Sequence, residues 1–533
     1  MKEVERNSGE HVQKTKTGEH VMKTKAETVI GIDSGTTYHK LATMDKTSNP
    51  RPNKQPDGSY SIPSVINING DKITVGVEAE NMRAIEPENT VQHPKRELSI
   101  DTPDGSPPIV HVDENGKKTS VVEACAHILR TVRENAEKVS TDPITSAVIS
   151  VPACANEAQR QRTKEAARLA GFDEVFLVDE PVAAALAAGV SDELSPGQRL
   201  LMVDVGGGTS DVVLVTKDAN GDLTASATSG REDVAGNEYD AKMIEIITTQ
   251  LIKEGVSQET VDDPCMRHHV LDHARKAKHD LSRAKSTRIA LFIDGKKVVI
   301  DLTRDEFESA TQDITDQIME IVERVLTENN ITPAEVNIVI PMGGSSRIQA
   351  IRDRLVKQFA DVRIPEDPDL LVAMGCAIAH GKILEAAGRD IQTPEAETIP
   401  ALPGGNFKTC AGFSLGCKAF NAGSTLAEFA EIIAKNSTLP ASNTQIFSMK
   451  QLGQNQVDVI VLQGELGQSP EDCLLIDTLH LTGLPPEDGK GNARIEVTYD
   501  YKADGLVVVT ATDKLSKKSV TTDISHYIAT PNS

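Results

Sequence analysis

The chain begins with a polar stretch, and a regular hydrophobic pattern starts only at Thr28. Residues 1–27 contain few apolar side chains and repeat one polar motif, Gly-Glu-His-Val, at 9–12 and 18–21. Such a segment cannot bury a hydrophobic core, so we expect it to be a disordered tail. From Thr28 to about residue 388, short apolar runs alternate with amphipathic stretches. This pattern predicts the alternating strands and helices of an α/β domain.

Two of the apolar runs resemble each other. Val29–Asp33 is followed by a turn that contains Gly35, Thr36 and Thr37, and Leu200–Asp204 is followed by the turn at 205–209, rich in glycine. In each copy an apolar strand ends in aspartate, a Gly/Thr turn follows, and a second strand begins. This internal repeat predicts two related lobes that face each other across a cleft.

Two helices can be placed from their end signals and periodicity. Asn156 is a suitable N-cap for a helix from Glu157 to Leu169, and Gly171 is a suitable stop signal. The stretch 303–327 has amphipathic periodicity and acidic residues near its start, which predicts a single helix.

The pattern changes again after residue 388. Residues 389–409 are rich in proline and glycine, which is typical of a linker. Further on, 494–501 alternates polar and apolar residues, and Asp504-Gly505 then separates it from another apolar run. This is the signature of a β-hairpin. We therefore expect an all-β domain at 410–527 and a short tail at 528–533.

Composition narrows the classes of partner and compartment. A chain of 533 residues suggests three or four domain-sized units. The net charge of -23 disfavours nucleic acid and anionic membranes as partners. The seven cysteines include no C-x-x-C pair, and there is neither an 18-residue apolar run nor an apolar N-terminal region. These features favour a cytoplasmic protein.

The repeated turns have a chemical meaning. Glycine lets the backbone approach a phosphate closely, turn amides and threonine hydroxyls donate hydrogen bonds to it, and a strand-end aspartate can hold a hydrated divalent cation. A third turn places Gly343 and Gly344 after a strand, followed by Arg347, whose guanidinium is suited to stack on a base. The alternative, three ordinary turns, does not explain why all three occur in the order that a nucleotide clamp needs.

These motifs resemble those of a known superfamily. Val29–Thr37, Leu201–Ser210 and Ile338–Arg347 are similar to the two phosphate motifs and the adenosine motif of the actin, sugar-kinase and heat-shock ATPases. Asp179–Ala185 and Ala434–Pro440 resemble, within that superfamily, the heat-shock 70-kDa chaperones of the DnaK type. The similarity extends over about residues 28–526.

The resemblance implies an actin-like (ribonuclease H-like, duplicated) ATPase domain at 28–388, a linker at 389–409 and a peptide-binding β-sandwich at 410–527. It implies binding of ATP or ADP with magnesium, potassium nearby, and direct attack of water on the γ-phosphate. The implied partners are unfolded or extended polypeptides, a J-domain co-chaperone and a nucleotide exchange factor. Since the sequence stops where the family continues into a helical lid, we expect a truncated member that lacks this lid.

Site residues follow by matching positions to the family. Asp33 and Asp204 correspond to the acids around magnesium, and Pro152 and Arg160 to an allosteric switch and relay. The catalytic candidates are Lys95, Glu180, Asp204, Thr209 and Asp211. The nucleotide-binding candidates are Gly35, Thr36, Thr37, Tyr38, Gly206, Gly207, Gly208, Thr209, Gly236, Lys278, Ser282, Gly343, Gly344, Ser345, Arg347 and Asp369. The peptide-binding candidates are Phe420, Ile446, Phe447, Val457 and Val459, which alternatively belong to the sandwich core.

Two departures keep other functions open. Arg275 stands where the family has a glutamate that contacts the ribose, and the segment 393–403 lacks the family's aliphatic-acidic linker. Both features favour a second hypothesis, a nucleotide-binding regulatory or scaffold protein with weak or no ATPase activity. A third, an actin-like sugar kinase, requires a general-base aspartate beside a sugar pocket, and no feature of the sequence assigns one.

Overall fold

The computed structural model describes residues 28–523, apart from 46–47, 101, 103–105, 139, 141–142, 154, 191–192, 222, 294, 388, 390–406, 409, 421–425, 450–452, 486–492 and 503–506. The two predicted tails, the Asp504-Gly505 turn and most of the predicted linker therefore lie outside the described residues. Within the described part, no helix is both long and apolar enough to cross a membrane.

A first sheet is built around the N-terminal apolar run. Its strands lie in the order β11-β10-β1-β2-β3, and β4 also pairs with β2. The strands are β1 (Ile30–Ser34), β2 (Tyr38–Met44), β3 (Pro50–Pro52), β4 (Ser61–Pro63), β10 (Ser146–Val151) and β11 (Glu174–Asp179). β1 is buried along its whole length and pairs with the parallel strand β10 on one side and the antiparallel strand β2 on the other.

A second sheet repeats this strand-turn-strand start. Its order is β17-β12-β13-β14-β18, and β12 lies antiparallel to β13 and parallel to β17. The strands are β12 (Arg199–Val205), β13 (Ser210–Lys217), β14 (Leu223–Arg231), β17 (Ile338–Met342) and β18 (Phe407–Lys408). The last of these lies inside the predicted linker and adds a parallel edge strand beside β14.

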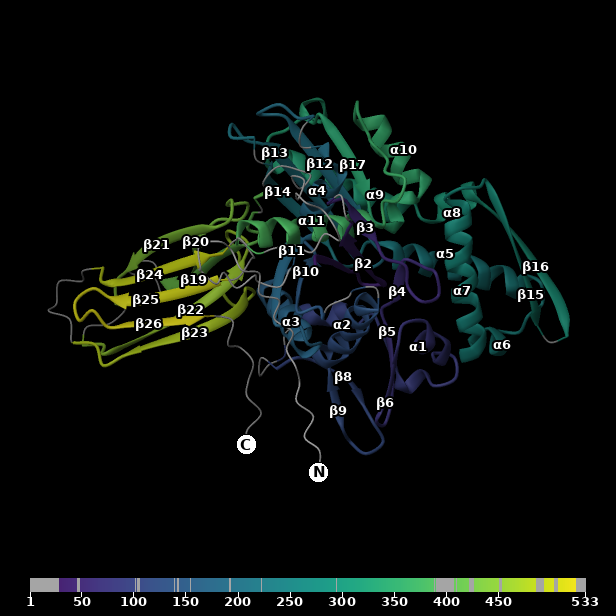
Figure 1. The fold of residues 1–533 in the computed structure, drawn as a ribbon, viewed down its shortest axis with the longest axis horizontal. Coiled ribbons are helices and arrows are strands. Elements are labelled where there is room, and N and C mark those ends of the chain that lie inside the picture. Colours follow the sequence, from purple (N-terminus) through teal and green to yellow (C-terminus); the bar gives the residue numbers. More distant parts are fainter. Residues whose placement is uncertain are drawn as a thin grey trace, which may run out of the picture.

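Two helices pack between these sheets. α11 (Leu371–Ala386) contacts β1 and β2 of the first sheet and shares a buried apolar core with β12, β13 and β17 of the second (Figure 1). α4 (Glu180–Ala188) packs against α11 so closely that a Cβ at Gly375 would lie 1.7 Å from the carbonyl oxygen of Ala183. Only glycine at this position lets the backbones of α4 and α11 come so close.

The remaining helices cover the outer faces of the sheets. α2 (Val121–Glu137) and α3 (Glu157–Leu169) share a core with the first sheet, and several helices share a larger core with the second. These are α5 (Gly236–Lys253), α6 (Gln258–Asp262), α7 (Pro264–Leu281), α8 (Arg304–Ala310), α9 (Gln312–Glu328) and α10 (Gln349–Gln358). The cap of α3 is the predicted one, because the Asn156 side chain accepts the Gln159 N–H at 2.8 Å.

The helix predicted at 303–327 is divided in two by Thr311. The structure has α8 and α9 on either side of this residue, whose φ and ψ of -116° and 14° are not helical. The Thr311 hydroxyl donates to the carbonyl of Phe307 at 2.9 Å, a bond that threonines inside α2, α3 and α9 also make without breaking the helix. The single-helix prediction was therefore wrong at this position.

Smaller units project from the two sheets. Near the first sheet they are β5 (Val65–Asn69), β6 (Lys72–Val75), β7 (Thr90–Gln92), α1 (Val77–Met82), β8 (Ile109–Val112) and β9 (Lys118–Ser120). Near the second sheet a ribbon consists of β15 (Ser286–Ile293) and β16 (Lys296–Thr303). Short 3-10 turns at Pro94–Ser99 and Gly344–Arg347 carry site candidates.

The C-terminal part is all-β in its described residues. One sheet has the order β20-β19-β22-β23 and the other β21-β24-β25-β26 (Figure 1). The strands are β19 (Ser414–Phe420), β20 (Ala427–Ile433), β21 (Ala441–Phe447), β22 (Gln456–Gly464), β23 (Leu474–Thr482), β24 (Ile495–Tyr501), β25 (Val507–Asp513) and β26 (Ser519–Asp523). The apolar faces of both sheets form one core, so they pack as a sandwich.

The sandwich contacts the α/β part directly. The backbone N–H of Glu157 donates to Gln463 Oε1 at 3.2 Å, and that of Thr228 donates to Asn436 Oδ1 at 3.2 Å. Cys410 is buried in the apolar core that surrounds α4 and α11. The C-terminal part therefore contacts α3, which covers the first sheet, and β14 of the second sheet.

Candidate functional site

A cavity of about 470 Å³ lies where the turns of the two sheets meet. Most predicted nucleotide and metal residues line it: Asp33, Gly35, Thr36, Thr37, Tyr38, Glu180, Asp204, Gly206, Gly207, Thr209, Lys278, Ser282, Gly343, Gly344, Ser345, Arg347 and Asp369. Four predicted residues, Lys95, Gly208, Asp211 and Gly236, are not among the lining residues. Each is next to one of them, namely Glu180, Thr36, Asp204 and Gly206 in the same order.

The two Gly/Thr turns face each other at contact distance. A Cβ at Gly207 would lie 2.0 Å from Thr37 Oγ1, and one at Gly208 would lie 2.5 Å from Thr36 Cγ2. Among the described residues, the buried Thr37 hydroxyl has no hydrogen-bond partner. Two facing turns with donor groups form a cradle suited to a phosphate chain, and a buried hydroxyl without a partner favours a polar ligand there.

Lys95 and Glu180 form a buried ion pair behind this cradle. Lys95 Nζ lies 2.7 Å from Glu180 Oε1, and the two side chains are 4% and 9% exposed. Burial alone lowers the pKa of Lys95, but the carboxylates of Glu180, Asp33 and Asp211 together raise that pKa above its ordinary value, so the lysine stays protonated. Since Glu180 lines the cavity, the pair holds the Lys95 ammonium one side chain away from the cavity.

Four carboxylates gather around the same point. Burial raises the pKa of Asp204, and the nearby carboxylates of Glu180, Asp211 and Asp33 raise it further. The ammonium groups of Lys95 and Lys40 interact electrostatically with acids of this cluster.

The described residues contain no group of three or more His, Cys, Asp and Glu side chains close enough to bind a metal directly. The carboxylates around Asp33 and Asp204, the two predicted metal acids, nevertheless fit a hydrated divalent cation that is held through its waters. Both of these residues line the cavity, and Asp211 lies opposite Asp204 on β13.

Lys40 also lines the cavity, although it was not among the predicted site residues. It follows the first turn on β2, and its Nζ lies 3.0 Å from Asp33 Oδ2. Burial alone lowers the pKa of Lys40, but Asp33 and Asp369 raise it above the ordinary value. A signal was present, because Lys40 follows Asp33 by the same number of residues as Asp211 follows Asp204.

Cationic side chains from α7 and from the third turn also line the cavity. Lys278 Nζ lies 2.7 Å from Asp240 Oδ1, and Arg347 Nη2 lies 3.1 Å from Asp369 Oδ2. Arg275, the departure from the family pattern, lines the cavity and pairs with Glu80 of α1 at 3.3 Å. His279 also lines the cavity and was not predicted.

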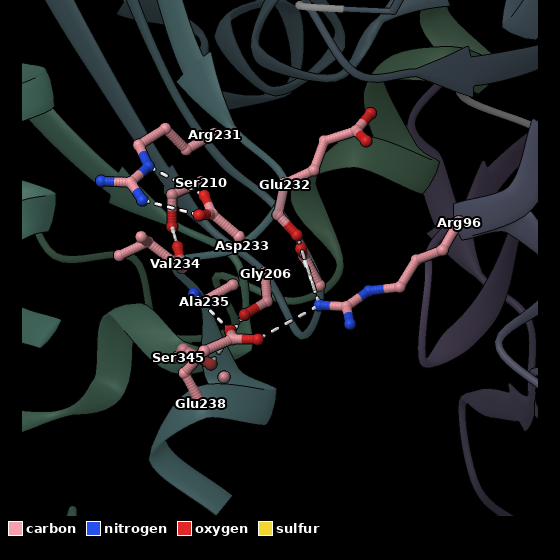
Figure 2. A network of polar contacts seen from close by, with 12 residues as sticks. Arg96, Gly206, Ser210, Arg231, Glu232, Asp233, Val234, Ala235, Glu238 and Ser345 are labelled. Carbon is pink, nitrogen blue, oxygen red and sulfur yellow. Dashed lines mark hydrogen bonds and ion pairs between the residues drawn. The ribbon is translucent and has the colours of Figure 1, made fainter. Parts of the chain in front are cut away.

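A polar network joins the Lys95 segment to the second sheet. Figure 2 shows Arg96, the neighbour of Lys95, reaching the segment 232–238. Its Nη2 donates to the carbonyl of Gly208 at 3.1 Å, and Ser345 Oγ donates to the carbonyl of Gly206 at 2.8 Å. These bonds fix the second turn from both sides, so the cradle is held by contacts from outside it.

The predicted allosteric residues lie near the sandwich. Pro152 is buried at the end of β10, and Arg160 of α3 makes a buried ion pair with Asp179 at 2.6 Å. Arg160 also interacts electrostatically with Tyr501 of β24. Asp179 directly precedes Glu180, so the Arg160–Asp179 ion pair lies one residue along the chain from the Lys95–Glu180 pair.

The predicted peptide-binding residues fall into two groups. Phe420 and Ile446 are 39% and 44% exposed, whereas Val459 is 6% exposed and belongs to the sandwich core. Phe447 and Val457 are partly buried and pack against that core. Exposed apolar groups are therefore available on β19 and β21, whereas Val459 of β22 belongs to the core.

A comparison with known protein families agrees with this architecture. The family model described as "Hsp70 protein" matches residues 29–531, which covers both the α/β part and the β-sandwich. The match extends over far more than half of the chain. The protein therefore belongs to the Hsp70 family, which has a chaperone-type, ATP-binding role.

Proposed function

We propose that this chain hydrolyses ATP and uses the nucleotide state to control binding of extended polypeptide by its β-sandwich. The observation that carries the proposal is the buried Lys95–Glu180 pair, at 2.7 Å, behind two facing Gly/Thr turns. A binding protein without catalysis has no need of a buried lysine behind the phosphate cradle, because burying its charge is costly.

Each part of the cavity has a role in this proposal. The turns at 35–38 and 206–209 hold the phosphates, while Lys278, Ser282 and Arg347 hold the nucleoside. Magnesium, held through water by Asp204 and Asp211, would screen the phosphate charge. Lys95 stabilises negative charge that develops on the γ-phosphate and orients the attacking water. Glu180 keeps Lys95 in position.

The sandwich supplies the second half of the function. We infer that an extended peptide lies across the β19 and β21 side, where Phe420 and Ile446 expose apolar surface. Backbone hydrogen bonds would provide affinity without regard to sequence, and an apolar pocket would select one side chain. The hydrogen bond of Glu157 with Gln463 and the electrostatic interaction of Arg160 with Tyr501 provide a route by which the two parts influence each other.

The direct test is the ATPase rate with and without an unfolded peptide. We expect slow magnesium-dependent hydrolysis that the peptide stimulates, because the sandwich contacts α3, beside the Asp179-Glu180 segment. Hydrolysis without stimulation would contradict coupling but not catalysis. No phosphate release in a single turnover would contradict the enzymatic function.

A further inference from the structure

The first strand-turn-strand unit carries a cation where the second carries an acid. Asp33 of β1 pairs in register with Lys40 of β2, and Asp204 of β12 pairs in register with Asp211 of β13. In both units the second residue follows the aspartate by seven positions. Lys40 and Asp211 therefore occupy equivalent places in the two copies of one structural motif.

The ammonium group of Lys40 lies among carboxylates inside the cavity. It is 3.0 Å from Asp33 Oδ2, and the Lys40 side chain is only 16% exposed. It also interacts electrostatically with Asp369 and Asp204, which line the same cavity. The Lys40 ammonium thus interacts with several carboxylates that surround the proposed phosphate site.

Asp33 has donors from the chain on both of its carboxylate oxygens. Lys40 donates to Oδ2, and Ser150 Oγ donates to Oδ1 at 3.4 Å. A carboxylate in this state is poorly available as a ligand for a mobile cation. In the second unit Asp204 and Asp211 present two carboxylates instead, which suits a hydrated cation.

We propose that the Lys40 ammonium supplies, beside Asp33, the positive charge that a potassium ion would otherwise supply to bound phosphate. This inference rests on the proposed nucleotide site. An ammonium fixed to the chain donates charge-assisted hydrogen bonds to phosphate oxygens and remains in place when the buffer cation changes. Nucleotide binding by this chain should therefore be independent of potassium, and the magnesium-binding side of the cleft is the side of Asp204 and Asp211.

The test is the dissociation constant of ADP, measured calorimetrically with magnesium on the full chain. Chloride salts of potassium, sodium and tetramethylammonium are compared at equal ionic strength, so that screening is the same. We expect the parent constants to agree within about twofold. Lys40→Gln should bind about 10- to 100-fold more weakly in tetramethylammonium, since it loses a charge-assisted bond, and potassium should restore part of the affinity.

Two further variants define the comparison. Lys40→Arg keeps the charge and should bind ADP independently of potassium. Lys72→Gln, which removes an exposed lysine of β6, should behave as the parent does. If Lys40→Gln does not fold, the parent in the three salts and Lys40→Arg still decide the question.

Two results would overturn the role of Lys40. One is a parent affinity that falls tenfold or more without potassium, and the other is a folded Lys40→Gln that binds as tightly as the parent in tetramethylammonium. A parent that binds no ADP in any salt is a different outcome, because it removes the proposed nucleotide site as well.

Discussion

The backbone of Gly207 lies against the side chain of Thr37, so close that a Cβ would fall 2.0 Å from the threonine hydroxyl. The two residues come from different sheets, and their contact forms the phosphate cradle. Any side chain at 207 must push the two turns apart. The distance between the two turns therefore depends on the lack of a Cβ atom at position 207.

The first prediction follows from this contact. Gly207→Ala should weaken ADP binding by about 10- to 100-fold, because a displaced turn loses one or two hydrogen bonds to charged phosphate. Calorimetric titration measures the effect. Gly416→Ala, which creates a similar clash with the Ala430 carbonyl inside the sandwich, should destabilise that domain and leave ADP affinity unchanged. Equal ADP affinity in Gly207→Ala and the parent would be incompatible with the cradle.

The second prediction concerns acid stability and His39. Burial, and then the charges of Lys95 and Lys40, lower the pKa of His39 to about 3. The unfolded chain therefore binds one more proton than the folded chain between the ordinary histidine pKa and about pH 3. The stabilisation is complete above the ordinary pKa and is lost as the pH falls, at about 1.4 kcal/mol per pH unit for this residue.

Urea unfolding, followed by circular dichroism at about unit steps of pH from 7.5 down to 4.5, tests this loss of stability. His39→Gln should flatten the dependence below about pH 6.5. A variant with the same pH dependence as the parent would show that His39 is not held neutral by the fold.

The third prediction separates the peptide surface from the core beneath it. Ile446→Ser should weaken peptide binding with little change in stability, because Ile446 is exposed on β21. Val459→Ala should lower the free energy of unfolding by about 2 kcal/mol, because it opens a cavity in the sandwich core. Leu515→Ser, at another exposed apolar position, is the control for peptide binding. If Ile446→Ser binds peptide as the parent does and Leu515→Ser binds it more weakly, the peptide does not lie at Ile446.

The fourth prediction concerns the contact between the two parts of the chain. Gln463→Ala removes the acceptor of the Glu157 N–H and should cost about 1 kcal/mol of docking, a shift of about fivefold in the docked population. Peptide stimulation of the ATPase should fall while the basal rate is kept. Gln456→Ala, on an exposed position of the same strand, serves as the control. Unchanged stimulation in Gln463→Ala would mean that this contact does not transmit the signal.

The parts of the fold that were predictable depend on local signals. Asn156 and Gly171 define the two ends of α3 because capping is a property of a few neighbouring residues. The break at Thr311 was missed because the apolar period of α8 resumes in α9, so the pattern alone does not indicate that the helix is interrupted.

In the candidate site, too, local signals were predictable and contacts between distant residues were not. The glycine turns are visible in the sequence because they repeat, whereas the pairing of Lys95 with Glu180 joins residues 85 positions apart and needs the fold. Lys40 was overlooked because a lysine in an alternating strand is ordinarily solvent-exposed. Its burial becomes evident only when Asp33 is placed opposite it. Val459 likewise could not be assigned to core or groove until the two sheets of the sandwich were packed.

The central claim is that the Lys95–Glu180 pair serves ATP hydrolysis. The most direct measurement is single-turnover hydrolysis of radiolabelled ATP by the parent, Lys95→Met and the double variant Lys95→Met/Glu180→Gln. The double variant removes the charge that Lys95→Met alone leaves buried without its partner. We predict a rate about 100- to 1000-fold lower in both variants, with nucleotide still bound. Hydrolysis at the parental rate by a folded Lys95→Met variant would contradict the assigned chemistry.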